Sequence, residues 1–417
     1  MDRALLDTLF AHAVAKAQPA LAVRLNLPPR PLGRTIVIGA GKASAQMARA
    51  FEDAWDGPLT GLVVTRYGYG QDCERIEIVE AAHPVPDEAG FLAARRIMEA
   101  VSGLGPDDLV VALISGGGSS LLPAPAAGLT FEDEQAINRT LLASGAPIGV
   151  MNLIRNQFSI IKGGRLAALA APARVATLVV SDVPGDDPAL VASGPTIALG
   201  GDRALARQYA ALYRLGLPAA AAALLAGETN LAPLPGDPLF AANSVRTIAS
   251  AALSLEAAAD LARSHGVAAA ILSDSIEGEA RDVALVHAAM AREIAARNRP
   301  FPKPVVLLSG GETTVTLRGK GRGGRNGEFL LAFAIAIDGV EGITALAADT
   351  DGIDGSEDNA GAYADGTTAT RLREIGIDPL EALANNDAYS AFAAIGDLLV
   401  TGPTGTNVND FRAIVIR

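Results

Sequence analysis

The sequence predicts an α/β protein with mainly parallel β-sheets, divided into more than one domain. Short runs rich in Val, Ile and Leu are followed by glycine-containing loops and then by stretches with helical spacing of apolar residues, the order expected of β-α-β units. The chain has 417 residues, of which 50% are hydrophobic and 19% are charged. This composition excludes a disordered chain and supports two or three domains of about 100–200 residues each.

The expected strands form two series separated by a proline-rich stretch. After Gly227 the chain contains three prolines, ending at Pro238, a composition typical of a linker or domain crossing. We therefore predict domains at residues 1–236 and 237–417. The first series comprises Thr35–Ile38, Leu62–Thr65, Ile76–Val79, Leu109–Ile114 and Thr177–Val180. The second comprises Ala268–Leu272, Val305–Leu308, Thr313–Leu317, Thr344–Ala347, Leu398–Val400 and Ala413–Ile416.

Charge and composition exclude several classes of protein. The net charge of −12 does not fit a protein that binds nucleic acid through phosphates. A single cysteine, Cys73, excludes an intramolecular disulfide and a thiolate zinc cluster. The longest apolar run, Phe329–Ile337, is shorter than the roughly 18 residues of a spanning helix, and the N-terminus lacks the pattern of a signal peptide. We expect a cytoplasmic protein that binds neither nucleic acid nor a membrane.

Small polar loops follow the expected strands in both halves of the chain. Ligands of open parallel sheets bind beyond the carboxyl ends of the strands. Good turn formers alone would explain one such loop, but seven favour a binding site, which we predict in the cleft between the domains. The loops are Gly39–Lys42, Ser115–Ser120, Ser181–Asp187, Ser273–Gly278, Ser309–Glu312, Asp349–Gly355 and Thr401–Asn407.

The run Ser115–Ser120 is the strongest candidate for a phosphate-binding loop. Its three consecutive glycines let backbone N–H groups converge on an anion, its serines add hydroxyl donors, and a helix is expected to begin just downstream. The chain lacks the pattern GxxxxGK[ST], so this loop is not of the Walker type. A plain strand-to-helix turn is the alternative.

The first loop, with Gly39, Gly41 and Lys42, follows a strand and opens a helix. The third small position is Ser44, and no carboxylate for a ribose hydroxyl follows at the expected distance, which disfavours an NAD site. Arg66 could still bind the 2′-phosphate of NADP. We favour Lys42 as a point charge directed at a phosphate or carboxylate, with a solvated lysine at a helix start as the alternative.

Cations and carboxylates recur in the second half. Arg325 and Asn326 directly precede the apolar run and would be fixed at a helix start, where an arginine can bind phosphate or carboxylate bidentately. Asp349 and Asp351 follow an expected buried strand, and Mg²⁺ needs only one or two carboxylates beside phosphates. The neighbouring Asp354 could instead cap a helix.

Two further polar residues lie in loops of the first half. Asp182, with Asp186 and Asp187, forms a second acidic group that could also cap a helix. His83 lies in a proline-rich loop, and we assign it no role. No Ser–His–Asp or Cys–His arrangement stands out, so glycines, cations and strand-end aspartates together favour phosphoryl transfer.

These motifs resemble the glycerate 2-kinase family, in order and along nearly the whole chain. Those that resemble its N-terminal domain are Val37–Ser44, His83–Asp87, Ser115–Ser120, Ser181–Asp186 and Ser193–Thr196. Those that resemble its C-terminal MOFRL domain are Ser309–Thr314, Gly323–Glu328, Asp349–Gly355 and Gly402–Asn407.

The resemblance implies ATP and Mg²⁺ as cofactors, D-glycerate as acceptor, and 2-phosphoglycerate and ADP as products. It implies a Rossmann-like, three-layer N-terminal domain and a smaller α/β C-terminal domain with the site in the cleft. It favours a lysine at the position of Lys42 and an arginine at that of Arg325. We hypothesise that Asp182 orients the acceptor hydroxyl and that Asp349 and Asp351 bind the metal. The nucleotide-binding residues are expected to be Gly39, Gly41, Ser115, Gly116, Gly117, Gly118, Ser119, Ser120, Asn326, Thr404 and Asn407.

Other readings stay open. Some members of the family carry the name hydroxypyruvate reductase, and an NADP-dependent reductase would use Gly39–Ser44 for the pyrophosphate and Arg66 for the 2′-phosphate. A non-catalytic sensor of sugar acids or nucleotides is a third hypothesis. The sequence does not set the oligomeric state and leaves a homodimer open.

Overall fold

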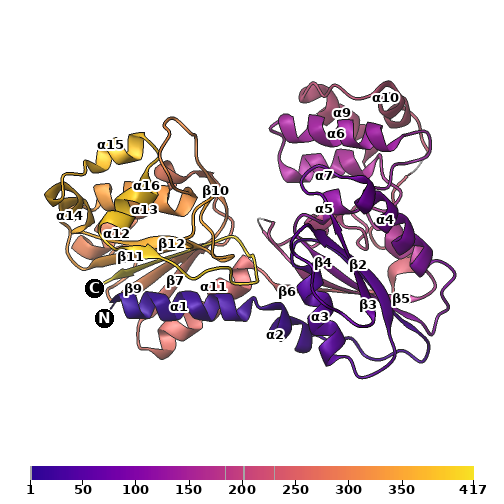
Figure 1. Cartoon of the computed structure of the whole chain (residues 1–417), viewed down its shortest axis with the longest axis horizontal. Coiled ribbons are helices and arrows are strands. Elements are labelled where there is room, and N and C mark those ends of the chain that lie inside the picture. The colour runs from indigo at the N-terminus through magenta and orange to yellow at the C-terminus, as the bar shows by residue number, and fades with distance from the viewer. Residues whose placement is uncertain (1, 184, 201, 230) are drawn as a thin grey trace. The chain divides into compact units, whose positions relative to one another are not determined.

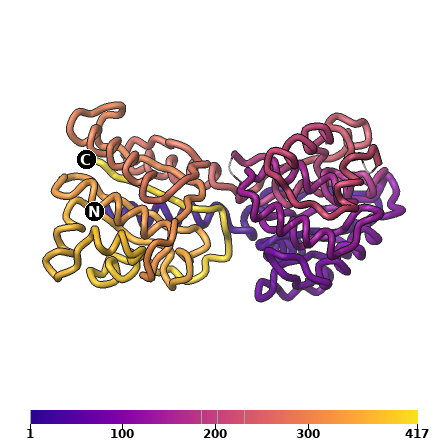
Figure 2. Tube along the Cα trace, turned by 90° about the horizontal axis from the view of Figure 1, so that it is seen from above, coloured from indigo at the N-terminus to yellow at the C-terminus, as the bar shows by residue number. Residues whose placement is uncertain are grey.

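The computed structural model describes residues 2–183, 185–200, 202–229 and 231–417. These residues form two compact units (Figure 1). The N-terminal unit comprises Pro19–Val183 and Asp187–Ile248, and the C-terminal unit comprises Ala249–Arg417 together with the segment that ends at Gln18 and with Gly185 and Asp186. Figure 2 shows this indigo segment among the orange and yellow parts of the chain.

The N-terminal unit is built on a six-stranded sheet in the order β3-β2-β1-β4-β5-β6. The pairs among β1 to β5 are parallel, and β1 and β4 are buried along their whole length. The order is that of a Rossmann-type doubly wound sheet, whose ligands bind where the order reverses, between β1 and β4. The strands are β1 (Thr35–Ala40), β2 (Thr60–Arg66), β3 (Ile76–Ala81), β4 (Leu109–Ser115), β5 (Arg174–Val180) and β6 (Ser244–Ala249).

Helices of this unit cover the sheet or form a separate layer (Figure 1). Ala93 and Ile97 of α4 belong to the core that contains Ile38 and Val110 of the sheet. A second, smaller core joins α6, α7, α9 and α10. The helices are α2 (Pro19–Arg24), α3 (Ser44–Ala54), α4 (Glu88–Val101), α5 (Gly118–Leu121), α6 (Phe131–Ala143), α7 (Ile148–Asn156), α8 (Arg165–Ala170), η1 (Val191–Ser193), α9 (Arg203–Leu212), α10 (Ala219–Ala226) and η2 (Pro238–Phe240).

The C-terminal unit contains a mixed six-stranded sheet in the order β13-β12-β11-β14-β9-β7. Only β7 and β9 pair in parallel, and the last strand of the chain lies antiparallel between β11 and β9. The strands are β7 (Ala268–Ser273), β9 (Val305–Ser309), β11 (Ile343–Asp349), β12 (Gly361–Asp365), β13 (Leu398–Leu399) and β14 (Asp410–Ile416), and β8 (Gly278–Glu279) pairs separately with β10 (Thr313–Thr314).

Apolar helices pack on both faces of this sheet. One core contains residues of α12 and α13, and the other contains residues of α1 and α11. The helices are α1 (Asp2–Lys16), α11 (Ala251–Ser264), α12 (Ala280–Arg297), α13 (Arg325–Ala336), α14 (Thr368–Glu374), α15 (Pro379–Ala384) and α16 (Ala388–Ala394). Among the residues described, no helix is long and apolar enough to cross a membrane.

The compact units do not divide where the sequence placed its boundary. They separate at Ile248, because β6 follows the proline-rich stretch and still joins the first sheet. The N-terminal helix belongs to the other unit, because Leu6, Leu9 and Phe10 share a core with α11 and the second sheet. Both differences arise from pairing between distant segments, which local composition does not report.

Candidate active site

The loops after β1 and β4 are joined by hydrogen bonds at the point where the strand order reverses. The Lys42 backbone N–H donates to the Gly116 carbonyl at 2.9 Å, and the Ala43 N–H donates to the Ser115 hydroxyl at 3.0 Å. Gly41 has φ +143°, and a Cβ there would lie 2.1 Å from the Ser115 Oγ. Only glycine fits this crossing, so the sequence fixes how the two loops meet.

Each glycine after Ser115 brings a different side chain to the loop. A Cβ at Gly116 would lie 1.6 Å from Asp182 Oδ2. A Cβ at Gly117, where φ is +81°, would lie 3.0 Å from His83 Nε2 and 3.3 Å from Lys42 Cγ. The structure therefore gathers Lys42, His83 and Asp182 around this loop. We predicted two of these residues.

His83 is the residue that the sequence analysis missed. It lies in the loop directly after β3, and this strand-end position was the available signal. Burial and the charges of Lys42 and Arg66 lower the pKa of His83 to about 4, so the imidazole is neutral at pH 7. It can donate or accept a hydrogen bond without changing the charge of the loop.

The Lys42 ammonium group supplies positive charge beside the loop Ser115–Ser120, and no carboxylate among the described residues pairs with it. Lys42 is partly buried, and no described residue forms a salt bridge or side-chain hydrogen bond with its ammonium group. The expected helix start is only the four-residue turn α5, so its dipole adds little. Donors of the loop and the Lys42 side chain are therefore the groups available to an anion.

Arg325, the first residue of α13, is paired with three carboxylates in the C-terminal unit. Its Nη2 donates to Asp349 Oδ2 at 2.5 Å, its Nε to Asp410 Oδ1 at 2.7 Å, and its Nη1 to Glu312 Oε1 at 3.2 Å. Asp349 ends β11, and Asp410 lies opposite it at the start of β14. The antiparallel register thus places both acids beside Arg325.

Asp410 and Glu312 were not predicted. Asp410 is buried and also accepts from the guanidinium of Arg412. Its position before the final apolar run was a weak signal, because the strand was expected to begin only at Ala413. Only the pairing of β14 with β11 reveals that its carboxylate faces Asp349.

Asn326 and Asp354 are held at the start of α13. Asp354 accepts from the backbone N–H groups of Asn326 at 3.0 Å and Gly327 at 2.8 Å, so it acts as the helix cap that the sequence left as an alternative. The Asn326 side chain is fully buried and donates to Asp410 at 2.8 Å. In this structure its amide orients a carboxylate.

The loops at Asp349–Gly355 and Thr401–Asn407 lie against each other. The Thr404 N–H donates to the Asp351 carbonyl at 3.0 Å, and the Asn407 amide donates to Asp351 Oδ2 at 3.4 Å. The Asp351 N–H donates to Asp349 Oδ1 at 3.0 Å. The predicted residues of these two loops therefore form one hydrogen-bonded group.

Burial makes the carboxylates of this group hard to ionise. Burial and the neighbouring charges of Asp351 and Asp410 raise the pKa of Asp349, against the pull of Arg325. Burial raises the pKa of Asp354 to about 6. A cation bound here would lower both values, so the group favours positive charge.

The group also fits Mg²⁺ by its donor chemistry, because Mg²⁺ binds oxygen ligands and takes one or two protein carboxylates when phosphates supply the others. No set of three or more His, Cys, Asp or Glu side chains in the described ranges is arranged as a metal cage, and this mode of binding requires none.

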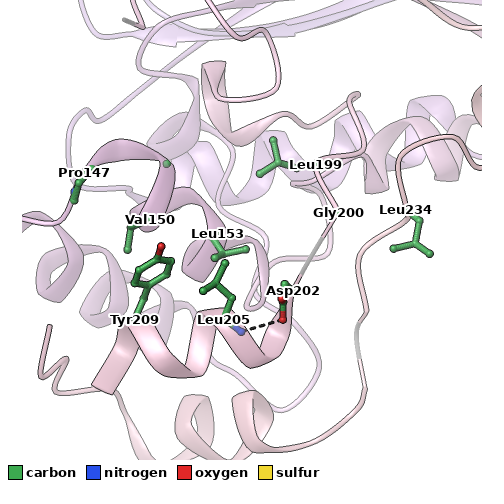
Figure 3. Close-up of a pocket in the computed structure, with 10 residues that line it drawn as sticks. Pro147, Val150, Leu153, Leu199, Gly200, Asp202, Leu205, Tyr209 and Leu234 are labelled. Atoms are coloured by element: carbon green, nitrogen blue, oxygen red, sulfur yellow. Dashed lines mark hydrogen bonds between the residues drawn. The ribbon is translucent and has the colours of Figure 1, made fainter. Parts of the chain in front are cut away.

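An apolar cavity of about 730 Å³ lies elsewhere, in the helical layer of the N-terminal unit (Figure 3). Asp202 at its edge is used locally, since its carboxylate accepts from the Leu205 N–H at 2.9 Å. None of the predicted site residues lines it. The lining residues are Pro147, Gly149, Val150, Leu153, Leu199, Gly200, Asp202, Leu205, Tyr209 and Leu234.

Comparison with known proteins places the chain in a family. Residues 5–226 match a domain of unknown function (DUF4147), and residues 305–410 match the MOFRL family. The chain is 40% identical to a D-glycerate 2-kinase of Thermotoga maritima over 94% of this chain and 93% of that protein. The chain belongs to the glycerate 2-kinase family.

Two further relatives agree with this assignment at the level of the whole chain. A crystal structure of a glycerate kinase from Thermotoga maritima superposes with a TM-score of 0.91 and 38% identity, covering 99% of both chains. A protein of Agrobacterium vitis named "Putative hydroxypyruvate reductase" is 53% identical over 99% of this chain and 94% of that protein. The predicted α/β architecture and family are thus confirmed, and the chain is an enzyme of a kinase family.

The site residues predicted from the sequence of this glycerate 2-kinase family member fall into two groups, one in each unit. The N-terminal group contains Lys42, Asp182 and the loop Ser115–Ser120. The C-terminal group contains Arg325 and the loops with Asp349 and Asn407. That both groups serve one site between the domains stays a prediction. Pro184 of the Ser181–Asp186 motif lies outside the described residues.

Proposed function

We propose that this protein transfers the γ-phosphoryl group of ATP to the 2-hydroxyl of D-glycerate, giving 2-phosphoglycerate and ADP. The observation that carries the proposal is the unpaired ammonium of Lys42 beside a glycine loop at the switch point of a Rossmann-type sheet. Phosphoryl transfer depends on positioning and charge neutralisation more than on a covalent nucleophile. The relative from Thermotoga maritima named D-glycerate 2-kinase supports the choice of acceptor.

The N-terminal group would bind and orient the anionic reactants. The hydroxyls and N–H groups of Ser115–Ser120 hold phosphate oxygens, and Lys42 neutralises the charge of the transferred group. Asp182 packs against Gly116 and would orient the acceptor hydroxyl. A carboxylate in this role accepts a hydrogen bond from the hydroxyl and aligns its oxygen for attack.

The C-terminal group would hold the metal. Asp349 and Asp351 are the ligands proposed for Mg²⁺, which supplies neutralisation of phosphate charge when bound. Arg325 holds Asp349 by a salt bridge at 2.5 Å. It can offer its charge to the transferred phosphoryl group once a metal competes for that carboxylate.

The test combines ATP, Mg²⁺ and D-glycerate with the full chain and follows the products by phosphorus NMR. We expect the resonance of 2-phosphoglycerate, which distinguishes it from the 3-isomer. The Lys42→Ala variant should lack the product, whereas the Lys320→Ala variant, altered at an exposed loop lysine, should retain it. Absence of any phosphorylated glycerate with the unaltered chain contradicts the proposal.

An NADP-dependent hydroxypyruvate reductase is the second candidate, favoured by the name of the Agrobacterium vitis relative and by the Rossmann-type strand order. Arg66, expected to bind the 2′-phosphate, is stacked on the Tyr69 ring at 3.7 Å from its centroid. Oxidation of NADPH by hydroxypyruvate, followed by its absorbance, would decide for the reductase. A sensor would show ligand-dependent thermal stabilisation without turnover in either assay.

A further inference from the structure

One of the three carboxylates that bind Arg325 is far more exposed than the others. The side chain of Glu312 is 51% exposed, whereas those of Asp349 and Asp410 are 6% and 0% exposed. The contact from Arg325 Nη1 to Glu312 Oε1 is also the longest of the three, at 3.2 Å. Within the described part of the chain, the Glu312 carboxylate has no other hydrogen bond or salt bridge. Of the three acids, Glu312 is therefore the one that can leave the guanidinium most easily.

The backbone on either side of Glu312 is held in place. The Gly311 carbonyl accepts from the Asp410 N–H at 3.1 Å, and the Thr313 N–H donates to Asp410 Oδ2 at 3.4 Å. Gly311 has φ +107°, and a Cβ there would lie 2.2 Å from the Ile276 nitrogen, so only glycine fits between these loops. Glu312 can thus leave Arg325 by rotation of its side chain alone, which in exposed residues takes picoseconds to nanoseconds.

The contacts of Arg325 leave an edge of its guanidinium for a ligand. Nε donates to Asp410 and Nη2 donates to Asp349, so the buried acids fix the orientation of the group. Each contact uses one hydrogen, and Nη1 and Nη2 each keep another. If Glu312 turns away, these two nitrogens can bind two oxygens of a carboxylate or phosphate in parallel. The Arg325 side chain is 23% exposed, so a ligand can reach it.

Exchange of Glu312 for an external oxyanion preserves the charge around Arg325. One carboxylate leaves and one anion enters, so the buried acids keep their contacts with the guanidinium. The released Glu312 carboxylate is already half exposed and becomes hydrated at little cost. Displacing Asp349 would instead break a buried ion pair, which is strongly destabilising.

We propose that Glu312 competes with an oxyanion of a reactant for the guanidinium of Arg325, and that it turns away when this oxyanion binds. The ligand is an oxyanion, either the carboxylate of the acceptor or a phosphate group of the nucleotide. The competition selects against neutral molecules, because these cannot replace the charge of the carboxylate that they displace. The proposal rests on the proposed function in so far as Arg325 binds a reactant. It adds a residue that sets how tightly and how selectively that reactant is bound.

The first experiment measures steady-state kinetics of Glu312→Gln in the full chain, with ATP and D-glycerate varied separately. Glutamine keeps the shape of the side chain but removes the charge that competes for Arg325. The KM for the reactant that binds there should fall about two- to fivefold, the range of a partly exposed ion pair, with little change in kcat. A lower KM for D-glycerate assigns the oxyanion to its carboxylate, and a lower KM for ATP assigns it to the nucleotide.

The matched control is Glu77→Gln. Glu77 is 50% exposed, is paired with Arg96 at 2.5 Å, and lies near the start of β3, at the end of the strand opposite to the predicted site loops. Both variants lose one negative charge, so a general effect of net charge on anion binding would appear in both. Glu77→Gln should leave both KM values unchanged. Equal decreases in the two variants, no decrease in Glu312→Gln, or a fall in its kcat of about tenfold or more would overturn the proposal.

Direct binding distinguishes failure of this proposal from failure of the proposed function. If the unaltered chain does not phosphorylate glycerate, the proposed function fails. Isothermal titration calorimetry then measures the dissociation constants of D-glycerate and inorganic phosphate. Glu312→Gln should bind one of them about two- to fivefold more tightly than the unaltered chain. Equal dissociation constants for both ligands would overturn the competition.

A second variant, Glu312→Asp, carries the test if Glu312→Gln does not fold. Because the backbone at 312 is held in place, aspartate keeps the charge but withdraws the carboxylate from Arg325 by one methylene group. It should show part of the same decrease in KM or in the dissociation constant, and urea unfolding shows whether each preparation is folded. A purely structural role for Glu312 would weaken binding in a folded variant, and that result would overturn the proposal.

Discussion

The N-terminal and C-terminal groups of predicted site residues differ in whether their cation is paired with carboxylates. Lys42 lies beside a loop of hydrogen-bond donors and has no carboxylate partner among the described residues, whereas Arg325 is held by Asp349, Asp410 and Glu312. An anion can therefore bind at the first group without breaking an ion pair. The second group carries more carboxylate than guanidinium charge and is better suited to a cation. The comparison suggests that the N-terminal unit binds the phosphate and the C-terminal unit binds the metal.

The largest effect is expected for Arg325→Ala, because this arginine serves both folding and activity. Its loss would leave Asp349 without its salt-bridge partner and Asp410 with its other contacts only, among them Arg412 and Asn326, and breaking a buried ion pair typically costs about 3–5 kcal/mol. Activity should fall at least about 100-fold. Urea unfolding and steady-state kinetics measure the two effects. The control Arg322→Ala removes a mostly exposed arginine from the same glycine loop and should change stability by less than about 1 kcal/mol.

Lys42→Ala should lower activity without the loss of stability that accompanies it in Arg325→Ala. Because Lys42 has no internal partner, its removal should change the free energy of unfolding by no more than about 0.5 kcal/mol. Activity should still fall about 100- to 1,000-fold. Kinetics and urea unfolding of the same preparation provide the measurement. Near-normal turnover would show that Lys42 does not take part in catalysis, and the difference from Arg325 would then have no functional meaning.

The two groups should also differ in their response to pH. The pKa of Asp354 is raised from 3.8 to about 6, so the folded state binds more protons than the unfolded state between these values. Stability from this residue should therefore rise as pH falls from about 7 to 4, by up to about 3 kcal/mol. His83, whose pKa is lowered from 6.5 to about 4, acts in the opposite sense, because the unfolded chain binds its proton first and the stability from this residue falls as pH drops from about 7 to 4.

Unfolding of the wild-type chain and of Asp354→Asn, compared from pH 7 to 4.5, isolates the contribution of Asp354. The wild type should gain stability relative to the variant as pH falls, because asparagine does not titrate. A difference between the two proteins that stays constant over this range would contradict the raised pKa.

The smallest effect is expected for alanine substitutions at two separate glycines, Gly117 and Gly128. Gly117 and Gly128 have φ of +81° and +88°, so alanine at either should cost about 1–2 kcal/mol of backbone strain. Only the methyl group at 117 would press on His83 and Lys42, whereas that at 128 meets no atom within 4 Å. Gly117→Ala should therefore lower kcat/KM about tenfold, and Gly128→Ala should not. Equal activities would show that the loop tolerates displacement of Lys42.

Most strands could be predicted from composition, because buried parallel strands appear as continuous runs of Val, Ile and Leu. The expected strand Thr313–Leu317 is strand only at Thr313–Thr314. The strand β12, with its run Gly-Ala-Tyr-Ala-Asp, was missed because small residues carry a weak strand signal. The mixed order of the second sheet could not be predicted, since no local feature specifies that β14 lies between β11 and β9.

The sequence by itself determined the loops that meet at Gly41 and Ser115, because strand, glycine and helix follow one another locally and only glycine fits the crossing. It also determined the charged residues of the loops, namely Lys42 after β1, Arg325 at the start of α13 and the aspartates at and after the end of β11. Only the tertiary structure decided that Asp410 faces Asp349 and that His83 lies against Gly117. These contacts join segments far apart in the chain, and their geometry depends on sheet register and helix packing, which no short stretch of sequence specifies.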